Sequence, residues 1–425
     1  MLIVDELLRQ RHEAGKPISV GLVGAGAAAR MVAFHLTKPV DGIRLAAIAN
    51  RTLANATRLC KDLGVVAVEA RTRTALEDAV ARGTCAISDN AKLLCEAGTI
   101  DVIVDATGAV EFGADLALSA IQNGKHVVFL NTELDSTLGP ILKVRADKAG
   151  VTVTNTDGDE PGVAMNLVRY VKSIGLKPVA AGNIKGMVDL YRNPETQRDF
   201  AAKYSMNPQI VASFADGTKL SMESAVIANA TGFKVGKRGM YGERCGHVNE
   251  VINHLPMNQL LDGGLVDYAL GAAPHTGAFV VVHEEHPVRK SHLGYFKMGD
   301  GPLYVFYTPY HLPHLQIAST IARAALLGDP TVAPIAGPVC SVATVAKKDL
   351  KAGDELDGVG GFASYGVIEN TGAFEAEDLL PMGLSLGGRV RKDIRKDEPI
   401  KFSDVELPAG RLCDRLYAEQ KRHFS

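Results

Sequence analysis

Short apolar runs of strand length alternate with helix-like stretches through the first third of the chain. The five clearest runs begin at Ile18, Ile43, Asp101, Lys125 and Val151. Helices are expected at 5–15, 27–36, 54–63, 113–123 and 139–148, whereas 69–96 is mixed. Parallel strands need long crossover connections, usually helices. The alternation therefore predicts an α/β domain over residues 1–156, a Rossmann-type doubly wound parallel sheet.

The remainder of the chain divides into two further predicted domains. Residues 157–338 mix strands with Gly- and Pro-rich connections, with helices expected at 162–174 and 315–327, which indicates an α+β middle domain. Residues 339–425 hold two similar runs 44 residues apart, around Asp349 and Asp393, and a charged, helical tail. This pattern predicts a small β-rich module. Its basic residues are expected on a solvated face: Lys347, Lys348, Arg391 and Lys392.

The first strand ends on Gly24, Ala25, Gly26 and Ala27, directly before a predicted helix. In a dinucleotide fold the first glycine permits a tight turn, and the second lets the backbone approach a pyrophosphate at the helix N-terminus. Gly24, Gly26 and Ala27 are therefore predicted to bind a dinucleotide. The alternative is a plain strand-to-helix turn, but the surrounding strand–helix–strand frame favours the cofactor.

The end of the second strand distinguishes the two nicotinamide dinucleotides. An NAD site usually places a carboxylate there, whereas this chain has Asn50, Arg51 and Thr52. A guanidinium can pair with a 2′-phosphate that a carboxylate would repel. These three residues therefore favour NADP(H). A solvated Arg51 on the loop is the alternative.

Polar residues also end the next two strands, at the edge where open α/β sheets bind ligands. Ala106, Thr107 and Gly108 are expected beside the nicotinamide half of the cofactor. Asn131 and Glu133 follow the fourth run. Either side chain could face the nicotinamide or substrate, or cap the helix that follows, and the sequence leaves both readings open.

The middle domain supplies the candidate catalytic residues. Asp159 and Glu160 lie in a turn before Pro161. Two carboxylates there could orient a sugar's hydroxyls or bind Mg²⁺ or Mn²⁺, while a helix cap at Asp159 explains the same residues. Lys185 follows an apolar run and could donate a proton to an alkoxide or hold a phosphate. A solvated lysine is the alternative.

A Pro-bounded loop contributes Tyr310 and His311. His311 could act as an acid–base and Tyr310 could bind substrate, although loop histidines often only pair with backbone carbonyls. His314 lies three residues further on, but the pair lacks the other ligands of a closed metal site.

Composition excludes several classes of partner. Lys and Arg total 46 against 48 acidic residues, for a net charge of −2, which leaves no basic footprint for nucleic acid or an anionic membrane. The apolar stretches are too short for a transmembrane helix, and the N-terminus lacks the order of a secretory signal. Six scattered cysteines without a CxxC pair suggest buried thiols in a reducing compartment. A cytoplasmic protein is expected.

These residues lie in motifs that extend over nearly the whole chain. They are Gly24-Ala-Gly, Ile103-Val-Asp-Ala-Thr-Gly, Gly124-Lys-His-Val, Gly158-Asp-Glu-Pro, Ile227-Ala-Asn-Ala-Thr-Gly, Val266-Asp-Tyr, Pro309-Tyr-His-Leu and Val345-Ala-Lys-Lys-Asp-Leu. With them the chain resembles the homoserine dehydrogenase-like oxidoreductases that carry a C-terminal SAF domain. The resemblance implies that residues 339–425 are a SAF module. It also implies that Glu223, Asn229 and Thr231 form a polar wall of the substrate pocket.

The activity that the resemblance implies is a reductoisomerase-like conversion of 1-deoxy-D-xylulose 5-phosphate to 2-C-methyl-D-erythritol 4-phosphate with NADPH, in isoprenoid precursor synthesis. Three departures bear on the substrate. No Lys stands at Asn131–Glu133, unlike in homoserine dehydrogenases. Asn183 and Thr308 stand where reductoisomerase-like members carry Lys and Arg, so two charges that could hold a phosphate are missing.

The sequence thus predicts an NADP(H)-dependent oxidoreductase acting on a small polyhydroxylated compound, with a divalent metal as a further option. Lys185, Glu160, Asp159 and His311 are the expected catalytic residues; Asn131, Glu133, Asn229 and Tyr310 are the expected substrate contacts. The chain is expected to form a homo-oligomer. The alternatives are a plain dehydrogenase of a catabolic polyol or sugar acid, and a non-enzymatic cofactor-binding sensor or assembly protein.

Overall fold

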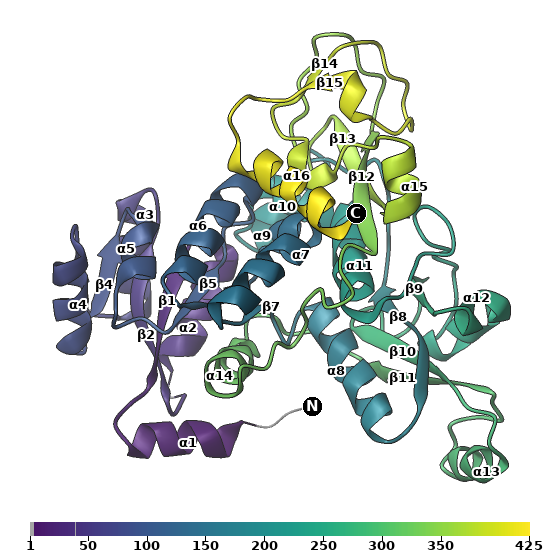
Figure 1. Ribbon diagram of the computed structural model, residues 1–425, viewed down its shortest axis with the longest axis horizontal. Helices are drawn as coiled ribbons and strands as arrows, with labels where there is room; N and C mark the ends of the chain where they lie inside the picture. Colours follow the sequence, from purple (N-terminus) through teal and green to yellow (C-terminus); the bar gives the residue numbers. More distant parts are fainter. Residues whose placement is uncertain (1–3, 39) are drawn as a thin grey trace.

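A seven-stranded parallel sheet forms the N-terminal part of the computed structural model, which describes residues 4–38 and 40–425 (Figure 1). The strand order is β3-β4-β2-β1-β5-β6-β7. The strands are β1 (Ile18–Val23), β2 (Ile43–Ala49), β3 (Ala67–Glu69), β4 (Cys85–Ser88), β5 (Val102–Asp105), β6 (His126–Phe129) and β7 (Val153–Asn155). The predicted doubly wound sheet is confirmed. The strand order reverses beside β1, and it is at such a point that open α/β sheets bind their ligands.

Seven helices accompany this sheet in the described residues: α1 (Asp5–Glu13), α2 (Ala27–Thr37), α3 (Leu53–Leu63), α4 (Arg73–Ala81), α5 (Ala91–Glu96), α6 (Val110–Gln122) and α7 (Thr132–Ala149). The mixed segment 69–96 contains β4, α4 and α5, and β3 ends at its start. Helix α7 begins seven residues before the predicted start at Gly139. Pro140 lies inside α7, where the packing of this helix against α6, α11 and α16 outweighs the local cost of a proline.

The middle part of the chain folds around a four-stranded sheet of order β11-β10-β8-β9. Its strands are β8 (Lys177–Lys185), β9 (Leu265–Leu270), β10 (Ala278–His283) and β11 (Leu303–Thr308). Alternate residues of β10 belong to different cores: Val280 packs with α8 and α11, and Val281 packs with the segment 248–260. Both faces of this sheet are therefore covered.

The helices of this part are α8 (Glu160–Ser173), α9 (Arg198–Lys203), α10 (Pro208–Ala215), α11 (Thr218–Thr231), α12 (Met257–Leu261), α13 (Pro287–Tyr295) and α14 (Ile317–Leu327), with the 3₁₀ turn η1 (Val248–Asn253). Helices α8 and α14 correspond to the two helices expected from the sequence. The predicted α+β character is confirmed, while the boundaries at residues 156 and 338 stay a prediction.

The C-terminal part is the predicted small β-rich module. It contains the antiparallel pairs β12 (Cys340–Ala346) with β13 (Ser364–Asn370) and β14 (Arg389–Val390) with β15 (Val405–Glu406). The remaining elements are α15 (Thr371–Ala376), η2 (Met382–Leu384), η3 (Phe402–Asp404) and α16 (Leu412–Phe424). Strands β12 and β13 pack on α11, and α16 returns to α6 and α7 (Figure 1). None of the helices described has the length and apolarity needed to span a bilayer.

The expected solvation of Lys347 is wrong. Its side chain is 4% exposed and its ammonium donates to the carboxylate of Asp216, 2.8 Å away. Charge in the sequence indicated a surface position, but a lysine can be buried where a carboxylate and backbone carbonyls take all of its protons.

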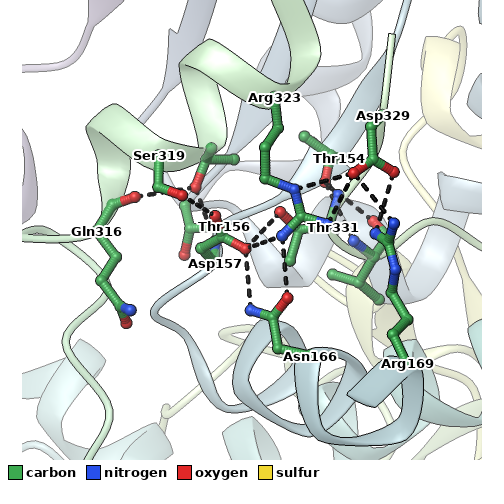
Figure 2. Close-up of polar contacts among 12 residues, drawn as sticks. Thr154, Thr156, Asp157, Asn166, Arg169, Gln316, Ser319, Arg323, Asp329 and Thr331 are labelled. Atoms are coloured by element: carbon green, nitrogen blue, oxygen red, sulfur yellow. Dashed lines mark hydrogen bonds and ion pairs between the residues drawn. The ribbon is translucent and has the colours of Figure 1, made fainter. Parts of the chain in front are cut away.

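A buried ion pair joins the turn after β7 to α14. The guanidinium of Arg323, 1% exposed, pairs with the carboxylate of Asp157, which is 2% exposed. The same carboxylate accepts hydrogen bonds from Asn166 (3.0 Å), Ser319 (2.7 Å) and Thr331 (2.7 Å), as Figure 2 shows. Because Asp157 directly precedes Gly158 and Asp159, this network fixes the start of α8.

We expect Arg323→Met to destabilise the protein by about 3–5 kcal/mol, because it leaves the Asp157 carboxylate buried without its counter-ion. Urea-induced unfolding measures the change. The control is Arg169→Met: that side chain pairs with Asp329 at 44% exposure and should cost less than about 1 kcal/mol. Equal effects of the two substitutions would contradict this account.

Candidate active site

The glycine turn after β1 has the geometry that a dinucleotide needs. Gly24 has φ +118°, and a Cβ there would come within 2.9 Å of the carbonyl oxygen of Ala106, so glycine is required for the close approach of β1 to the end of β5. A Cβ at Gly26 would meet no protein atom within 4 Å. Gly26 is the N-cap of α2 and has no side chain that could bond to the first N–H groups of the helix. The first turn of α2 also carries no acidic residue. The first N–H groups of α2 are thus available to a pyrophosphate.

The predicted nucleotide-selecting residues lie at the end of β2, at the same edge of the sheet. The Asn50 amide donates to the Thr52 carbonyl, 2.8 Å away, and shapes the loop. Arg51 is exposed and takes part in none of the ion pairs found among the described residues. Its guanidinium is therefore available to a phosphate.

A second polar group lies at the end of β5, beside the glycine turn. The buried carboxylate of Asp105 accepts from the backbone N–H of Thr107 (3.0 Å), from its hydroxyl (2.6 Å) and from the amide of Asn131 (2.9 Å). These bonds order residues 106–108 beside Gly24. The Asn131 side chain also accepts from the N–H of Leu134 (3.1 Å), so it caps α7, the second of the two readings that the sequence left open. Glu133 lies in the first turn of α7 and is half-buried.

Lys185 lies at the centre of the candidate catalytic cluster, at the end of β8. Its ammonium is 2.6 Å from Glu160 Oε1 and 3.2 Å from Glu223 Oε2. Glu160 is on α8 and Glu223 on α11, and their side chains are 4% and 3% exposed. The Asn183 amide also donates to Glu223, at 2.7 Å. Residues from three elements far apart in the sequence thus meet at one buried point.

The cluster is tied to the parallel sheet by Asp159. This residue is the N-cap of α8, but its carboxylate makes no capping bond and accepts instead from the Thr132 hydroxyl, 3.2 Å away. Thr132 opens α7 just beyond the carboxyl end of β6. The predicted catalytic carboxylates therefore lie at the sheet edge where a dinucleotide binds.

The loop that carries His311 also contacts the cluster, at Glu160. Nε2 of His311 lies 3.5 Å from Glu160 Oε2, and Nδ1 is 2.9 Å from the Thr276 hydroxyl. Gly158 allows this approach, because a Cβ there would come within 2.3 Å of the Leu312 carbonyl oxygen. Tyr310, next to His311, is 47% exposed.

Burial and neighbouring charges shift the pKa values of Glu223, Glu160 and Lys185 in different directions. Burial raises the pKa of Glu223 to about 8, with the Glu160 carboxylate adding to the effect and Lys185 opposing it. Burial also acts to raise the pKa of Glu160, but Lys185 and His311 outweigh it and lower that pKa to about 2. Burial lowers the pKa of Lys185, yet the two glutamates raise it further, so that its net shift is upward. Lys185 is thus an ammonium held by an ionised Glu160.

Two residues of the cluster were not selected from the sequence, Lys219 and Asn183. Lys219 is half-buried in the first turn of α11. Burial lowers its pKa, but the carboxylates of Glu133, Asp159 and Glu223 outweigh this and raise it. Lys219 and Glu223 are four residues apart, so a helix places them on one face. That spacing was the available signal.

Asn229 lies outside the cluster, contrary to its expected place on the pocket wall. It is 1% exposed, and its side-chain oxygen accepts from the N–H of Cys340 at the start of β12, 2.9 Å away. The Thr231 hydroxyl donates to the Ile227 carbonyl of its own helix. Asn229 is six residues from Glu223, and at about 3.6 residues per turn the two face different sides of α11.

Three family models match successive parts of the chain: "Homoserine dehydrogenase, NAD binding domain" at residues 20–154, "Oxidoreductase DRL, catalytic domain" at 158–317, and "SAF domain" at 342–406. The chain belongs to the homoserine dehydrogenase-like oxidoreductases with a C-terminal SAF domain. It is therefore an NAD(P)-dependent oxidoreductase, which removes the non-enzymatic alternative. A search of curated protein sequences finds no match to this oxidoreductase.

Solved structures resemble the oxidoreductase only distantly. A probable dehydrogenase from Thermotoga maritima has a TM-score of 0.44 and 13% identity, and the match covers 74% of this chain and 90% of that one. A homoserine dehydrogenase from Thiobacillus denitrificans has a TM-score of 0.41 and 16% identity, covering 80% and 84%. The family models, rather than these structures, support the assignment.

We expect Gly26→Ala to weaken NADPH binding by about tenfold or more, because the added methyl group occupies the path of the pyrophosphate. The free energy of unfolding should change by less than about 1 kcal/mol, because the methyl group meets no atom beyond its chain neighbours within 4 Å and only the N-cap of α2 is altered. Fluorescence titration of NADPH measures the affinity. Gly372→Ala, equally unobstructed but in α15, is the matched control and should bind NADPH normally. Undiminished affinity of Gly26→Ala would contradict the assignment of the turn.

Proposed function

We propose that this chain transfers a hydride between NADP(H) and a carbonyl or hydroxyl carbon of a small polyhydroxylated compound. The observation that carries the proposal is Lys185: a half-buried ammonium held by the buried carboxylates of Glu160 and Glu223, in a cluster that Asp159 ties to the proposed cofactor edge of the sheet. An ammonium at this place can bond to the oxygen of a reacting carbonyl while the ring of the dinucleotide lies against its carbon.

The residues of the site have separable roles in this proposal. When bound, the nicotinamide ring supplies or accepts the hydride. In the reduction, Lys185 donates a hydrogen bond to the carbonyl oxygen and gives it a proton as the alkoxide forms, which leaves a neutral amine. In the oxidation, it is that neutral amine of Lys185 that takes the proton from the hydroxyl group. Glu160 and Glu223 keep the ammonium in place. His311, Tyr310, Glu133 and Asp159 are available to the remaining hydroxyl groups of the substrate.

Replacing Lys185 by methionine should lower kcat by about 10²–10⁴-fold, because the proton donor is lost. NADPH affinity should not change, since Lys185 lies in the cluster rather than in the glycine turn. Steady-state kinetics and fluorescence titration measure the two quantities. Lys177→Met, at the exposed opposite end of β8, is the control and should retain full activity. Turnover by Lys185→Met at the unmodified rate would refute this role.

NADP(H) is proposed over NAD(H) because Arg51, and no carboxylate, follows β2. We expect Arg51→Ala to weaken NADPH binding by about tenfold or more through loss of charge-assisted bonds to the 2′-phosphate. Binding of NADH, which lacks that phosphate, should stay the same. Arg82→Ala is the control: Arg82 is exposed and lies before β4, at the opposite edge of the sheet. A parallel loss of NADH affinity would assign Arg51 a different role.

The charges of the cluster support a substrate that is not phosphorylated near the reacting carbon. The carboxylates of Glu160 and Glu223 contact Lys185, and, against the effect of burial, the charges of Glu133, Asp159, Glu160 and Glu223 raise the pKa of Lys219. Carboxylates accept hydrogen bonds from hydroxyl groups and repel phosphate. We therefore propose that the enzyme is a polyol or sugar dehydrogenase. A panel of polyols and sugar acids with NADP⁺, and of their carbonyl forms with NADPH, tests this proposal.

We also propose that the protein forms a homo-oligomer, which light scattering tests.

A reductoisomerase is the second candidate, and the metal-binding geometry favours it. One oxygen from each of Asp159, Glu160 and Glu223 lies within 4.8 Å of the others, and carboxylate oxygens are suitable ligands for Mg²⁺ or Mn²⁺. A divalent ion held there would polarise the carbonyl of a ketose. Lys185 already contacts two of these carboxylates, so it would have to share them with the ion.

The two candidates differ in a single assay. A reductoisomerase should oxidise NADPH when 1-deoxy-D-xylulose 5-phosphate and Mn²⁺ are both added, should lose the activity when EDTA removes the metal, and should lose it in Asp159→Asn. A plain dehydrogenase should be silent with this substrate and unaffected by EDTA on its own substrate. Absorbance at the NADPH band measures both.

A further inference from the structure

Residues 186–217, which we call the 186–217 segment, leave the middle domain as one closed excursion. The N–H of Asp189 donates to the carbonyl of Ala215, 2.9 Å away, and so joins the two ends of the segment at its base. Lys185 immediately precedes the segment, and Lys219 follows it by two residues. A shift of the base would therefore displace both lysines of the candidate active site.

Lys347 of the SAF domain holds this base from outside. Its ammonium donates to the carbonyl of Arg192 (2.7 Å), the carboxylate of Asp216 (2.8 Å) and the carbonyl of Gly361 (2.8 Å). All three ammonium protons are thus used, two of them on opposite sides of the base. The Asp216 side chain is fully buried, so Lys347 is its counter-ion at a point that water does not reach.

Further polar contacts join the SAF domain to the same segment. The Gln209 amide donates to the carbonyls of Asp357 (2.9 Å) and Val359 (3.0 Å), and Gly360 lies so close to the Gln209 carbonyl that a Cβ would come within 2.0 Å of it. The Tyr191 hydroxyl donates to Asp397, at 3.0 Å. The segment is therefore held at its base, along α10 and near its start.

A partly open pocket lies beside these contacts. A cavity of about 490 Å³ lies between the segment, α11 and the SAF strands, lined by Val188, Leu190, Leu220, Val345 and Val367 among others. Side chains that face a cavity lose contacts that a packed core would supply.

We propose that the SAF domain positions the active site, with Lys347 as the positioning residue that fixes the base of the 186–217 segment and, through it, Lys185 and Lys219. Lys347 does not touch the cluster. The consequence for catalysis rests on the proposed function of Lys185, whereas the clamp itself does not.

Hydrogen exchange of the full-length protein tests the clamp without any substrate. In Lys347→Met, amides of the 186–217 segment should exchange about tenfold faster or more, while those of β1, β5 and β6 keep their protection. Lys348→Met is the matched control: Lys348 is the exposed neighbour, and its loss should change nothing. Unchanged protection of the segment in Lys347→Met would overturn the proposal.

A milder variant serves if Lys347→Met does not fold. Tyr191→Phe removes one hydroxyl bond from a side chain that is 43% exposed. It should speed exchange only near the start of the segment, by a few-fold. Protection equal to that of the unmodified protein would count against the proposal.

Kinetics separate positioning from a general loss of structure. With a substrate found in the panel above, Lys347→Met should lower kcat by about tenfold and leave the Kd of NADPH unchanged. Lys347→Arg, which keeps the positive charge, should retain part of the kcat that Lys347→Met loses. A drop in kcat and NADPH affinity together, or full kcat, would overturn the positioning role. Absence of any turnover by the unmodified protein would count against the proposed function alone, because the exchange experiment stands without it.

Discussion

The buried pair of Asp157 and Arg323 is the contact on which the site most depends. A carboxylate out of reach of water is stable only when it is paired and hydrogen-bonded, and Asp157 has a guanidinium and three further side-chain donors. Because α14, α8 and β7 all contribute to this network, the turn that bears Asp159 and Glu160 has one position. The carboxylates of Asp159 and Glu160 are thereby fixed in place as well.

Charge balance explains how so many carboxylates share one place. Isolated, the side chains of Glu160 and Glu223 would each pay a large desolvation cost, and together they would repel. Lys185 lies between them and compensates part of this charge, while burial, and next the Glu160 carboxylate, still raise the pKa of Glu223. A substrate with several hydroxyl groups would add donors to these oxygens.

The three parts of the chain act on this point from different directions. The parallel sheet supplies the proposed cofactor edge, where Gly24, Gly26 and Thr132 lie. The middle domain supplies Lys185 and the glutamates, and Lys347 of the SAF domain holds the segment between the two lysines. The SAF module is packed on α11, the helix that carries Glu223.

Much of this could be predicted from local pattern alone, and the rest could not, for a physical reason. Strand and helix periods and the glycine turn depend on neighbouring residues, so the sequence determined the doubly wound sheet, the cofactor edge and the candidates Glu160, Lys185 and His311. Helix α7 was misjudged because tertiary packing outweighs the local cost of Pro140. Burial of Lys347, the bond of Asn229 to β12 and the meeting of Lys185 with Glu223 depend on partners distant in sequence. Only the tertiary structure brings those partners within hydrogen-bonding distance, and it alone decided which charges are buried together.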